Sequence, residues 1–257
     1  MLTRKQLREL HGGDLPLHVL EQDYIQSLFL REIYRNDSDL VFKGGTFIKH
    51  AFGLDRFSED LDFTLFRKID IRSLLNRASS SLERYGSTGR IDNYREDDLK
   101  VNARLRYAGP LYGGTERSMG SIMIEISKRN DIFREPVWTR LFFRYPETGV
   151  VNVLSLSREE VLAEKLRALS MRGKGRDLYD VWFLLRSKAK TDVDLFHKKM
   201  EVMGQEPIVR IGISKVEWDR DLTTLLQNPQ DLEDILIDVE GKLEEDGYKV
   251  LVSEEIG

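Results

Sequence analysis

Cysteine is absent from the 257 residues of this chain, and proline occurs only six times. The absence of cysteine excludes a disulfide scaffold, a thiol nucleophile and a cysteine-ligated zinc site. No apolar run approaches the roughly 18–20 residues that span a bilayer. Charged residues follow Met1 closely, where a signal peptide would have an apolar segment. We therefore expect a protein of the reducing cytoplasm that makes no membrane contact.

Several common catalytic motifs are also missing. The four histidines are scattered and form no His-Glu-x-x-His zinc motif. The sequence contains neither a Gly-x-Ser-x-Gly nucleophile elbow nor a Walker A motif. An EF-hand that began at Asp60 would need glycine six residues into the loop, where the chain has Leu65. Zinc hydrolase, serine hydrolase, P-loop and EF-hand chemistry are therefore excluded.

Charge is nearly balanced but unevenly distributed. The chain has 40 Lys and Arg residues against 44 Asp and Glu residues, a formal net charge of −4. Residues 228–257 hold ten acids and two bases, which leaves the rest mildly basic. This balance excludes a globally basic nucleic-acid-binding protein but permits a local basic groove. The acidic end is typical of a solvated helix face.

Hydrophobic periodicity predicts an α+β fold in two domains. Ser157 and Glu160 have the spacing of a capping box, which predicts a helix from this point to about residue 171. Composition changes just before it, so we expect a mixed α/β domain over residues 1–155 and a mainly helical domain over residues 156–257. The predicted strands are 40–42, 61–66, 101–107, 121–127 and 150–154. The other predicted helices are 17–36, 46–51, 71–85, 177–185, 195–203, 222–227 and 232–243.

Two carboxylates lie at the start of a predicted strand: Asp60 immediately precedes it and Asp62 is its second residue. Side chains two residues apart on a strand share a face, so these groups would repel one another unless a cation lay between them. Hard cations such as Mg²⁺ take oxygen sites of this kind. Glu125, between two isoleucines on a later strand, lies either on an exposed face or in a functional site. As a third carboxylate it would suit a two-metal phosphoryl-transfer site.

A glycine-rich turn precedes this pair. Lys43, Gly44, Gly45 and Thr46 connect a predicted strand to a predicted helix. Glycine allows close backbone approach to a ligand, and the first N–H groups of a helix favour an anion. An ordinary strand-to-helix turn would have the same residues. Asp60 follows Thr46 by 14 residues, which is enough for one helix and a return to the adjacent strand. The phosphate-binding turn and the metal-binding carboxylates would then meet at one edge of the sheet.

Two further groups lie on predicted helices. Lys165 borders an apolar stripe, where a lysine commonly extends its charge to solvent. Asp177 and Asp180 are three residues apart and share a helix face. We expect one of these two acids to cap the helix and pair with Arg176 or Lys165.

Six blocks of this sequence resemble the AbiEii/AbiGii toxin family, which includes the MenT-like toxins of type IV toxin–antitoxin and phage-defence systems. The order of the glycine turn, the two-acid strand and a third acid also resembles the polymerase-β type of nucleotidyltransferase. The resemblance covers about residues 17–186. The blocks are residues 43–46, 56–63, 105–111, 124–127, 164–166 and 176–180.

The resemblance implies a polymerase-β-type sheet domain followed by a helical domain, and a toxic NTP-dependent nucleotidyltransferase that uses Mg²⁺ or Mn²⁺. It assigns Lys43, Gly44, Gly45, Thr46 and Lys165 to nucleotide binding, with ATP among the candidate NTPs. It assigns Asp60, Asp62 and Glu125 to the metal, and Lys165 with Asp180 or Asp177 to catalysis. Thr46 replaces the serine that is common in the family and keeps the hydroxyl.

The implied partners are an NTP, an RNA acceptor and a cognate antitoxin protein. The 3′ end of tRNA is the acceptor that the resemblance favours, while other RNA, a protein or a small molecule also fit. Two other functions stay open: a catalytically inactive nucleotide- or partner-binding protein of the same fold, and a glycosyltransferase that holds a nucleotide sugar through Asp60 and Asp62.

Overall fold

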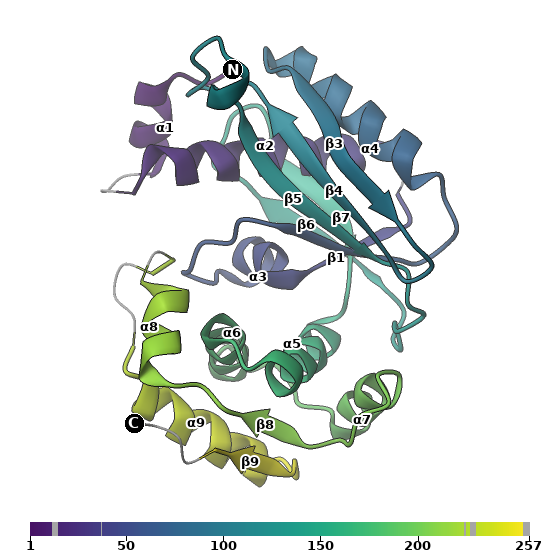
Figure 1. Cartoon of the computed structure of the whole chain (residues 1–257), viewed down its shortest axis with the longest axis vertical. Helices are drawn as coiled ribbons and strands as arrows, with labels where there is room; N and C mark the ends of the chain where they lie inside the picture. Colours follow the sequence, from purple (N-terminus) through teal and green to yellow (C-terminus); the bar gives the residue numbers. More distant parts are fainter. Residues whose placement is uncertain (12–14, 37, 224, 227–229, 254–257) are drawn as a thin grey trace. The chain divides into compact units, whose positions relative to one another are not determined.

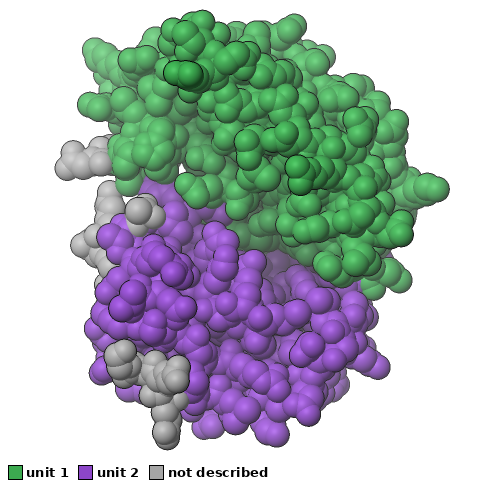
Figure 2. Space-filling model, in the orientation of Figure 1, with its two compact units in different colours: residues 1–51, 59–130, 136–155 green, residues 52–58, 131–135, 156–257 purple. Residues whose placement is uncertain are grey.

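The computed structural model describes residues 1–11, 15–36, 38–223, 225–226 and 230–253. The chain divides into two compact units (Figure 2). Unit 1 comprises residues 1–51, 59–130 and 136–155, and unit 2 comprises residues 52–58, 131–135 and 156–257. Unit 2 thus includes two short segments from the part of the sequence that otherwise builds unit 1.

Unit 1 contains a mixed sheet that has seven strands among the described residues, in the order β3-β4-β5-β2-β1-β7-β6 (Figure 1). The pairs β1–β7 and β2–β5 are parallel, and the other neighbouring strands are antiparallel. The strands are β1 (Leu40–Lys43), β2 (Leu61–Leu65), β3 (Gly89–Glu96), β4 (Lys100–Tyr107), β5 (Gly120–Ser127), β6 (Val137–Phe142) and β7 (Val150–Ser155).

The two faces of this sheet differ in polarity because apolar and polar residues alternate along the strands. Every second residue of β4 is buried, and the isoleucines of β5 are buried on the same face. Helix α2 (Leu17–Ile33) contacts β5 and β7, and α4 (Ile71–Ser80) contacts β3 and α2. Helices α1 (Arg4–His11) and α3 (Gly44–Phe52) complete the regular helices of this part of the chain. The apolar face is therefore covered, and the opposite face carries the polar side chains.

Unit 2 is mainly helical. The chain turns between its first two helices at Gly173, which adopts a left-handed φ of +54°. Strands β8 (Val209–Ile211) and β9 (Val250–Val252) form a short parallel pair. The helices are α5 (Arg158–Arg172), α6 (Gly175–Arg186), α7 (Val193–Glu201), α8 (Lys215–Leu222) and α9 (Leu232–Glu245).

A buried ion cluster holds the 131–135 segment in unit 2. Lys199 of α7 is 1% exposed, and its Nζ lies 2.8 Å from Glu160 Oε1 and 2.9 Å from Glu164 Oε1. It also donates to the backbone carbonyl of Asp131. Glu160 in turn accepts the backbone N–H of Phe133 at 2.8 Å. These bonds connect the segment to both α5 and α7.

The α+β class is confirmed, and the bounds of the five predicted strands are each correct to within one residue. Strands β3, β6, β8 and β9 and helices α1 and α8 were not predicted. Helix α3 begins at Gly44, two residues before the predicted start, and α4 gives way to a 3₁₀ segment over Ser81–Tyr85. The helix predicted over 222–227 is wrong, because α8 ends at Leu222; Thr224 and Gln227 lie outside the described residues.

The capping box predicted at Ser157 forms only in half. Ser157 Oγ accepts the Glu160 N–H at 3.2 Å, so the N-cap is confirmed. The Glu160 carboxylate is engaged in the buried ion cluster instead of returning to the Ser157 backbone. None of the helices in the described residues combines the length and the apolar character that crossing a bilayer requires.

Candidate active site

The glycine turn lies directly at the carboxylate of Asp62. Strand β1 ends at Lys43, and α3 starts immediately at Gly44, which has a φ of +79°. A Cβ atom at Gly44 would overlap Asp62 Oδ2. Glycine is therefore required here both by the left-handed backbone and by the approach of the carboxylate. The first N–H groups of α3 and the Asp62 carboxylate consequently lie at one place in unit 1.

Thr46 links the start of α3 to the start of β2. Its Oγ1 donates to the backbone carbonyl of Asp60 at 2.6 Å, and the residue is fully buried. This hydrogen bond spans fourteen residues of sequence. The Thr46 hydroxyl proton is therefore engaged with the backbone, and the residue holds the glycine turn against the two-acid segment.

Strand pairing places three of the predicted site residues in one row across the sheet. Asp62 of β2 is opposite Lys43 of β1 and opposite Glu125 of β5. Residues paired across neighbouring strands share a face, and for these three it is the polar face. Asp60 lies one residue before β2 and is half-buried, whereas Glu125 is exposed and makes no hydrogen bond or ion pair with any described residue.

The carboxylates of this row fit a divalent cation in their chemistry. Asp60, Asp62 and Glu125 offer oxygen atoms of the kind that Mg²⁺ and Mn²⁺ prefer. Gly44 leaves room at the Asp62 carboxylate that any side chain would fill. Among the residues that the structure describes, no three Asp, Glu or His side chains are grouped closely enough to hold a metal ion. The three-carboxylate metal site therefore stays a prediction.

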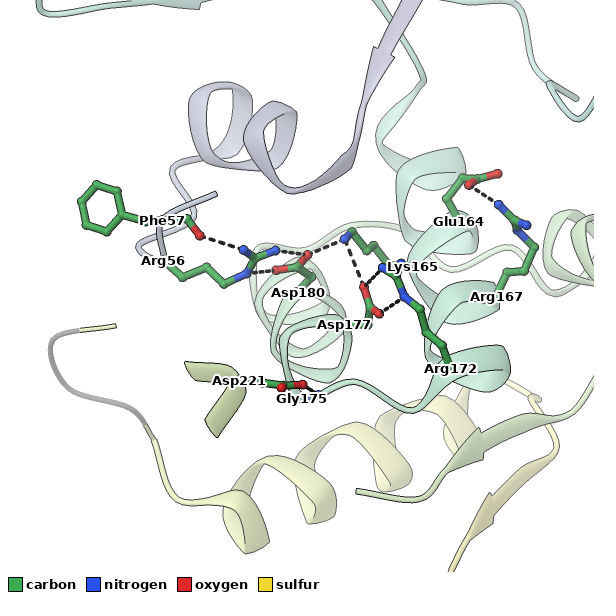
Figure 3. Close-up of polar contacts among 10 residues, drawn as sticks. All are labelled: Arg56, Phe57, Glu164, Lys165, Arg167, Arg172, Gly175, Asp177, Asp180 and Asp221. Atoms are coloured by element: carbon green, nitrogen blue, oxygen red, sulfur yellow. Dashed lines mark hydrogen bonds and ion pairs between the residues drawn. The ribbon is translucent and has the colours of Figure 1, made fainter. Parts of the chain in front are cut away.

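The other predicted residues form a buried charge network in unit 2 (Figure 3). Lys165 Nζ lies 2.7 Å from Asp180 Oδ2 and 3.3 Å from Asp177 Oδ1. Asp180 accepts from Arg56 Nε and Nη2, both at 2.6 Å, and Asp177 accepts from Arg172 Nε at 2.6 Å and Nη2 at 2.8 Å. Both carboxylates are fully buried. Each carboxylate thus makes a bidentate contact with one arginine, and Lys165 bridges the two carboxylates.

Local sequence explains how this network forms. Lys165 and Arg172 are seven residues apart on α5 and so lie on one helix face, two turns apart. Asp177 and Asp180 share a face of α6, which packs against α5 after the turn at Gly173. The α6 start is held by Asp221, whose Oδ2 accepts the Gly175 N–H at 3.1 Å.

The network keeps both carboxyls ionised. Burial by itself raises the pKa of Asp177, but Lys165 and Arg172 outweigh it and hold the pKa well below its ordinary value. Burial acts in the same way on Asp180, where Arg56 and then Lys165 lower the pKa. Three cations, Lys165, Arg56 and Arg172, contact the two carboxylates. An ammonium has three donors, and among the described residues only these two carboxylates accept from Lys165.

The structure refines the sequence interpretation of this second group. Lys165 is 8% exposed and does not extend to solvent, and both Asp177 and Asp180 contact it. Their ion pairs are with Lys165, Arg56 and Arg172, and not with Arg176 as the sequence left open. The part played by Arg56 was not predicted; its position four residues before Asp60, inside one of the motif blocks, was the only signal in the sequence. Within unit 1 the structure brings Lys43, the glycine turn, Asp62 and Glu125 together, and within unit 2 it brings Lys165, Asp177 and Asp180 together.

Comparison with known proteins identifies the family and the fold of the chain. Residues 28–250 match the family model described as nucleotidyl transferase AbiEii toxin, type IV TA system. The fold is similar to MenT4, a nucleotidyltransferase toxin from Mycobacterium tuberculosis H37Rv, with a TM-score of 0.68 and 19% identity over 94% of this chain and 88% of that one. It is also similar to JHP933 from Helicobacter pylori, with a TM-score of 0.58 and 23% identity over 91% and 96% of the two chains. Among curated protein sequences, none matches the chain.

Proposed function

Because the chain belongs to the AbiEii family of nucleotidyltransferase toxins of type IV toxin–antitoxin systems, we propose that it transfers a nucleoside monophosphate from an NTP to an RNA, with the 3′ end of tRNA as its acceptor. The acceptor hydroxyl would attack the α-phosphorus, lose its proton and displace pyrophosphate. The nucleotidyltransferase activity and the toxin role follow from membership of this family. The acceptor, the metal and the residue roles are the parts that we propose.

In this mechanism the residues of unit 1 bind the triphosphate. The N–H groups of Gly44, Gly45 and Thr46 at the start of α3 would donate to phosphate oxygens, since a helix N-terminus favours an anion. Lys43, which ends β1, would add a positive charge beside them. Thr46 acts by holding this turn, because its hydroxyl already donates to Asp60.

The carboxylates of Asp60, Asp62 and Glu125 would hold Mg²⁺ or Mn²⁺. A cation bound there neutralises charge on the triphosphate and lowers the pKa of an attacking hydroxyl. The Asp62 carboxylate lies at the glycine turn, so the proposed anion-binding and cation-binding groups would serve the same nucleotide. This contact between Asp62 and the Gly44 turn is the observation that carries the proposal.

Lys165 would stabilise the negative charge that develops on the transferred phosphoryl group. Among the described residues its ammonium contacts only the carboxylates of Asp177 and Asp180, which leaves a third N–H for a phosphate oxygen. Asp177 and Asp180 fix the position of its ammonium group through two buried contacts. Preorganised charges of this kind contribute several kcal/mol to a transition state, or roughly 10²–10³ in rate for one donor.

The test is nucleotide transfer by the purified full chain. Each of the four NTPs, labelled on the α-phosphate, is incubated with Mg²⁺ and total RNA, and the labelled RNA is identified on a gel. We expect label in RNA with wild-type protein and at least a hundredfold less with Asp62→Asn. The matched control is Asp39→Asn, because the one ion pair of the Asp39 carboxylate with a described residue is a long contact of 3.8 Å with Arg67.

A growth assay completes this test and separates the proposal from a catalytically inactive binding protein. Expression of the wild-type chain should arrest growth, and expression of Asp62→Asn should not. Label transfer that survives Asp62→Asn unchanged would refute the assigned site. Growth that is equally unaffected by both forms, together with no transfer by either, would favour the binding protein.

A further inference from the structure

The polar face of the unit 1 sheet separates its charges by strand. The β2 and β5 positions of this face hold Asp62 and Glu125, as described above. The β3 and β4 positions are mainly basic, with Asp92 and Asn102 among them, and we call the basic residues the cationic face. Its members are Arg90, Arg95, Lys100, Arg104 and Arg106.

Strand register fixes where these cations lie relative to the carboxylates. Asn102 of β4 is opposite Glu125, which is itself opposite Asp62. Arg104 and Lys100 flank Asn102 on the same face of β4. At about 4.8 Å per strand, β4 lies roughly 10 Å and β3 roughly 14 Å from β2. The cationic face is therefore a lateral continuation of the carboxylate row on one surface of one sheet.

A β-bulge contributes to this arrangement. The pairing of β3 with β4 shifts by one residue between Asp92 and Arg95, and Asn93 adopts a left-handed φ of +51°. Because of this shift, Arg95 and not Tyr94 is opposite Asn102. Bulges reorient side chains in this way, and here the bulge places a further cation on the polar face.

Three of the five cations form no ion pair in the described part of the chain, although Asp92 is opposite Arg104 and Asp97 lies near enough to Lys100 to interact with it electrostatically. Arg95, Lys100 and Arg104 make no ion pair with any residue that the structure describes. The Arg104 Nε lies 3.4 Å from the sulfur of Met123, a residue that is 40% exposed between the cations and the carboxylates.

Arg90 and Arg106 are directly opposite each other on β3 and β4, a pairing of like charges that is unfavourable. Arg90 is held by the carboxylates of Asp92 at 3.2 Å and Glu116 at 2.7 Å. Arg106 donates to the backbone carbonyl of Glu116 at 2.6 Å. Even with these two acids, the face retains a surplus of positive charge that a polyanion would neutralise.

We propose that the cationic face binds the phosphate backbone of the RNA acceptor, and that the strand runs from β3 across β4 toward the Asp62 and Glu125 row. This inference rests on the proposed function, since it concerns the acceptor of the same site. Guanidinium groups match phosphate geometry in a two-pronged way. Met123 offers an exposed apolar contact for a ribose or base on the same path. An RNA explains why cations line up beside carboxylates that must receive its reactive end, whereas an acidic protein partner would have no reason to approach those carboxylates.

The test measures RNA binding apart from catalysis. Fluorescein-labelled tRNA and a single-stranded RNA oligonucleotide are titrated with full-length protein, without NTP and with EDTA, and anisotropy gives Kd at several salt concentrations. The variant is Lys100→Gln with Arg104→Gln, because neither side chain is ion-paired to a described residue. The matched control is Arg140→Gln, an exposed arginine on β6 at the opposite edge of the same sheet face.

We expect the double variant to raise Kd about tenfold and to lower the salt slope by about 0.7 for each phosphate that the protein no longer neutralises. The control should leave both values unchanged. In the transfer reaction the double variant should raise KM for RNA and leave kcat and the KM for the NTP unchanged. Equal RNA affinity in double variant and wild type would overturn the proposal. The proposal would also be overturned if poly-glutamate displaced labelled RNA from the protein as effectively as unlabelled RNA of the same net charge does.

The outcome can be distinguished from failure of the proposed function. If wild-type protein transfers no nucleotide to RNA but binds RNA in a Lys100- and Arg104-dependent way, the transfer proposal fails and the binding face stands. If transfer to RNA occurs with the same KM in the double variant, the binding face fails and the transfer proposal stands.

Discussion

Replacing Arg56 with methionine should destabilise the protein by about 3 kcal/mol at neutral pH. Arg56 and Asp180 are both buried, with side chains 3% and 0% exposed, and two N–H···O contacts of 2.6 Å join them. Removing one partner of a buried ion pair destabilises by about 3–5 kcal/mol, because the remaining charge loses its compensation. Lys165 stays at 2.7 Å from Asp180 and compensates part of that charge, which places the expected value at the low end.

A second variant, Arg172→Met, is the matched control. Arg172 makes the same two-pronged contact with the equally buried Asp177, but its side chain is 45% exposed. Solvent screens such a pair, so we expect a loss nearer to about 1 kcal/mol. The assay is urea unfolding followed by tryptophan fluorescence, to which unit 2 contributes Trp182 and the fully buried Trp218.

The pH dependence distinguishes charge from packing. The pKa of Asp180 is lowered in the folded protein, so its contribution to stability is present above the ordinary carboxyl pKa of about 3.9 and is lost as pH falls toward the folded value. The difference between wild type and Arg56→Met should therefore shrink as pH falls below about 4, because a protonated Asp180 no longer needs Arg56. A loss of stability that is equal for the two arginines, or constant with pH, would refute the electrostatic reasoning.

Three further predictions concern the candidate site. Gly44→Ala should abolish nucleotide transfer, because the added Cβ would overlap the Asp62 carboxylate. Its control is Gly53→Ala, where φ is a similar +82° but the added Cβ has open space. The Gly53 variant should lose about 1–2 kcal/mol in urea unfolding from backbone strain alone, and the Gly44 variant should lose more. Thr46→Val should lose about 1 kcal/mol and raise KM for the NTP, whereas Thr46→Ser should restore both; equal effects of the two variants would point to packing instead of the hydrogen bond. Lys165→Met should reduce kcat by about 10²–10³ with a small change in urea midpoint, because two arginines still balance two carboxylates; a large loss of stability would show that the lysine is structural.

Sequence pattern was sufficient for the elements whose signal is local. Strand β4 alternates strictly between buried and polar residues, β5 alternates between buried isoleucines and exposed residues over 121–126, and each has a hydrogen-bonded strand on both sides. Strands β3 and β6 are at the edges of the sheet, where one flank is solvent. The segment that forms β3 has five charged or amide side chains and Gly89 among its eight residues, so its composition resembles a loop. These edge strands form because their neighbours pair with them, which no local pattern records.

The candidate site divides in the same way. The glycine turn, the two acids and Lys165 were identified from residue types at fixed spacing and from resemblance. The partners of these residues were not, because Arg56 is 124 residues from Asp180, and sequence spacing carries no information about which arginine meets which acid at that separation. Thr46 was assigned to nucleotide binding, and only the structure shows that its hydroxyl donates to the backbone carbonyl of Asp60.

Because unit 2 is built from non-contiguous segments, it constrains both co-translational folding and the design of truncated proteins. A fragment that begins at residue 156 would contain Asp180 without Arg56, and Lys199 without the carbonyl of Asp131. During synthesis Arg56 leaves the ribosome long before Asp180 does. Unit 2 can therefore complete its fold only if residues 52–58 are still available to pack against the later helices. Dissecting the protein into separately expressed halves would therefore yield a C-terminal piece with an under-compensated interior.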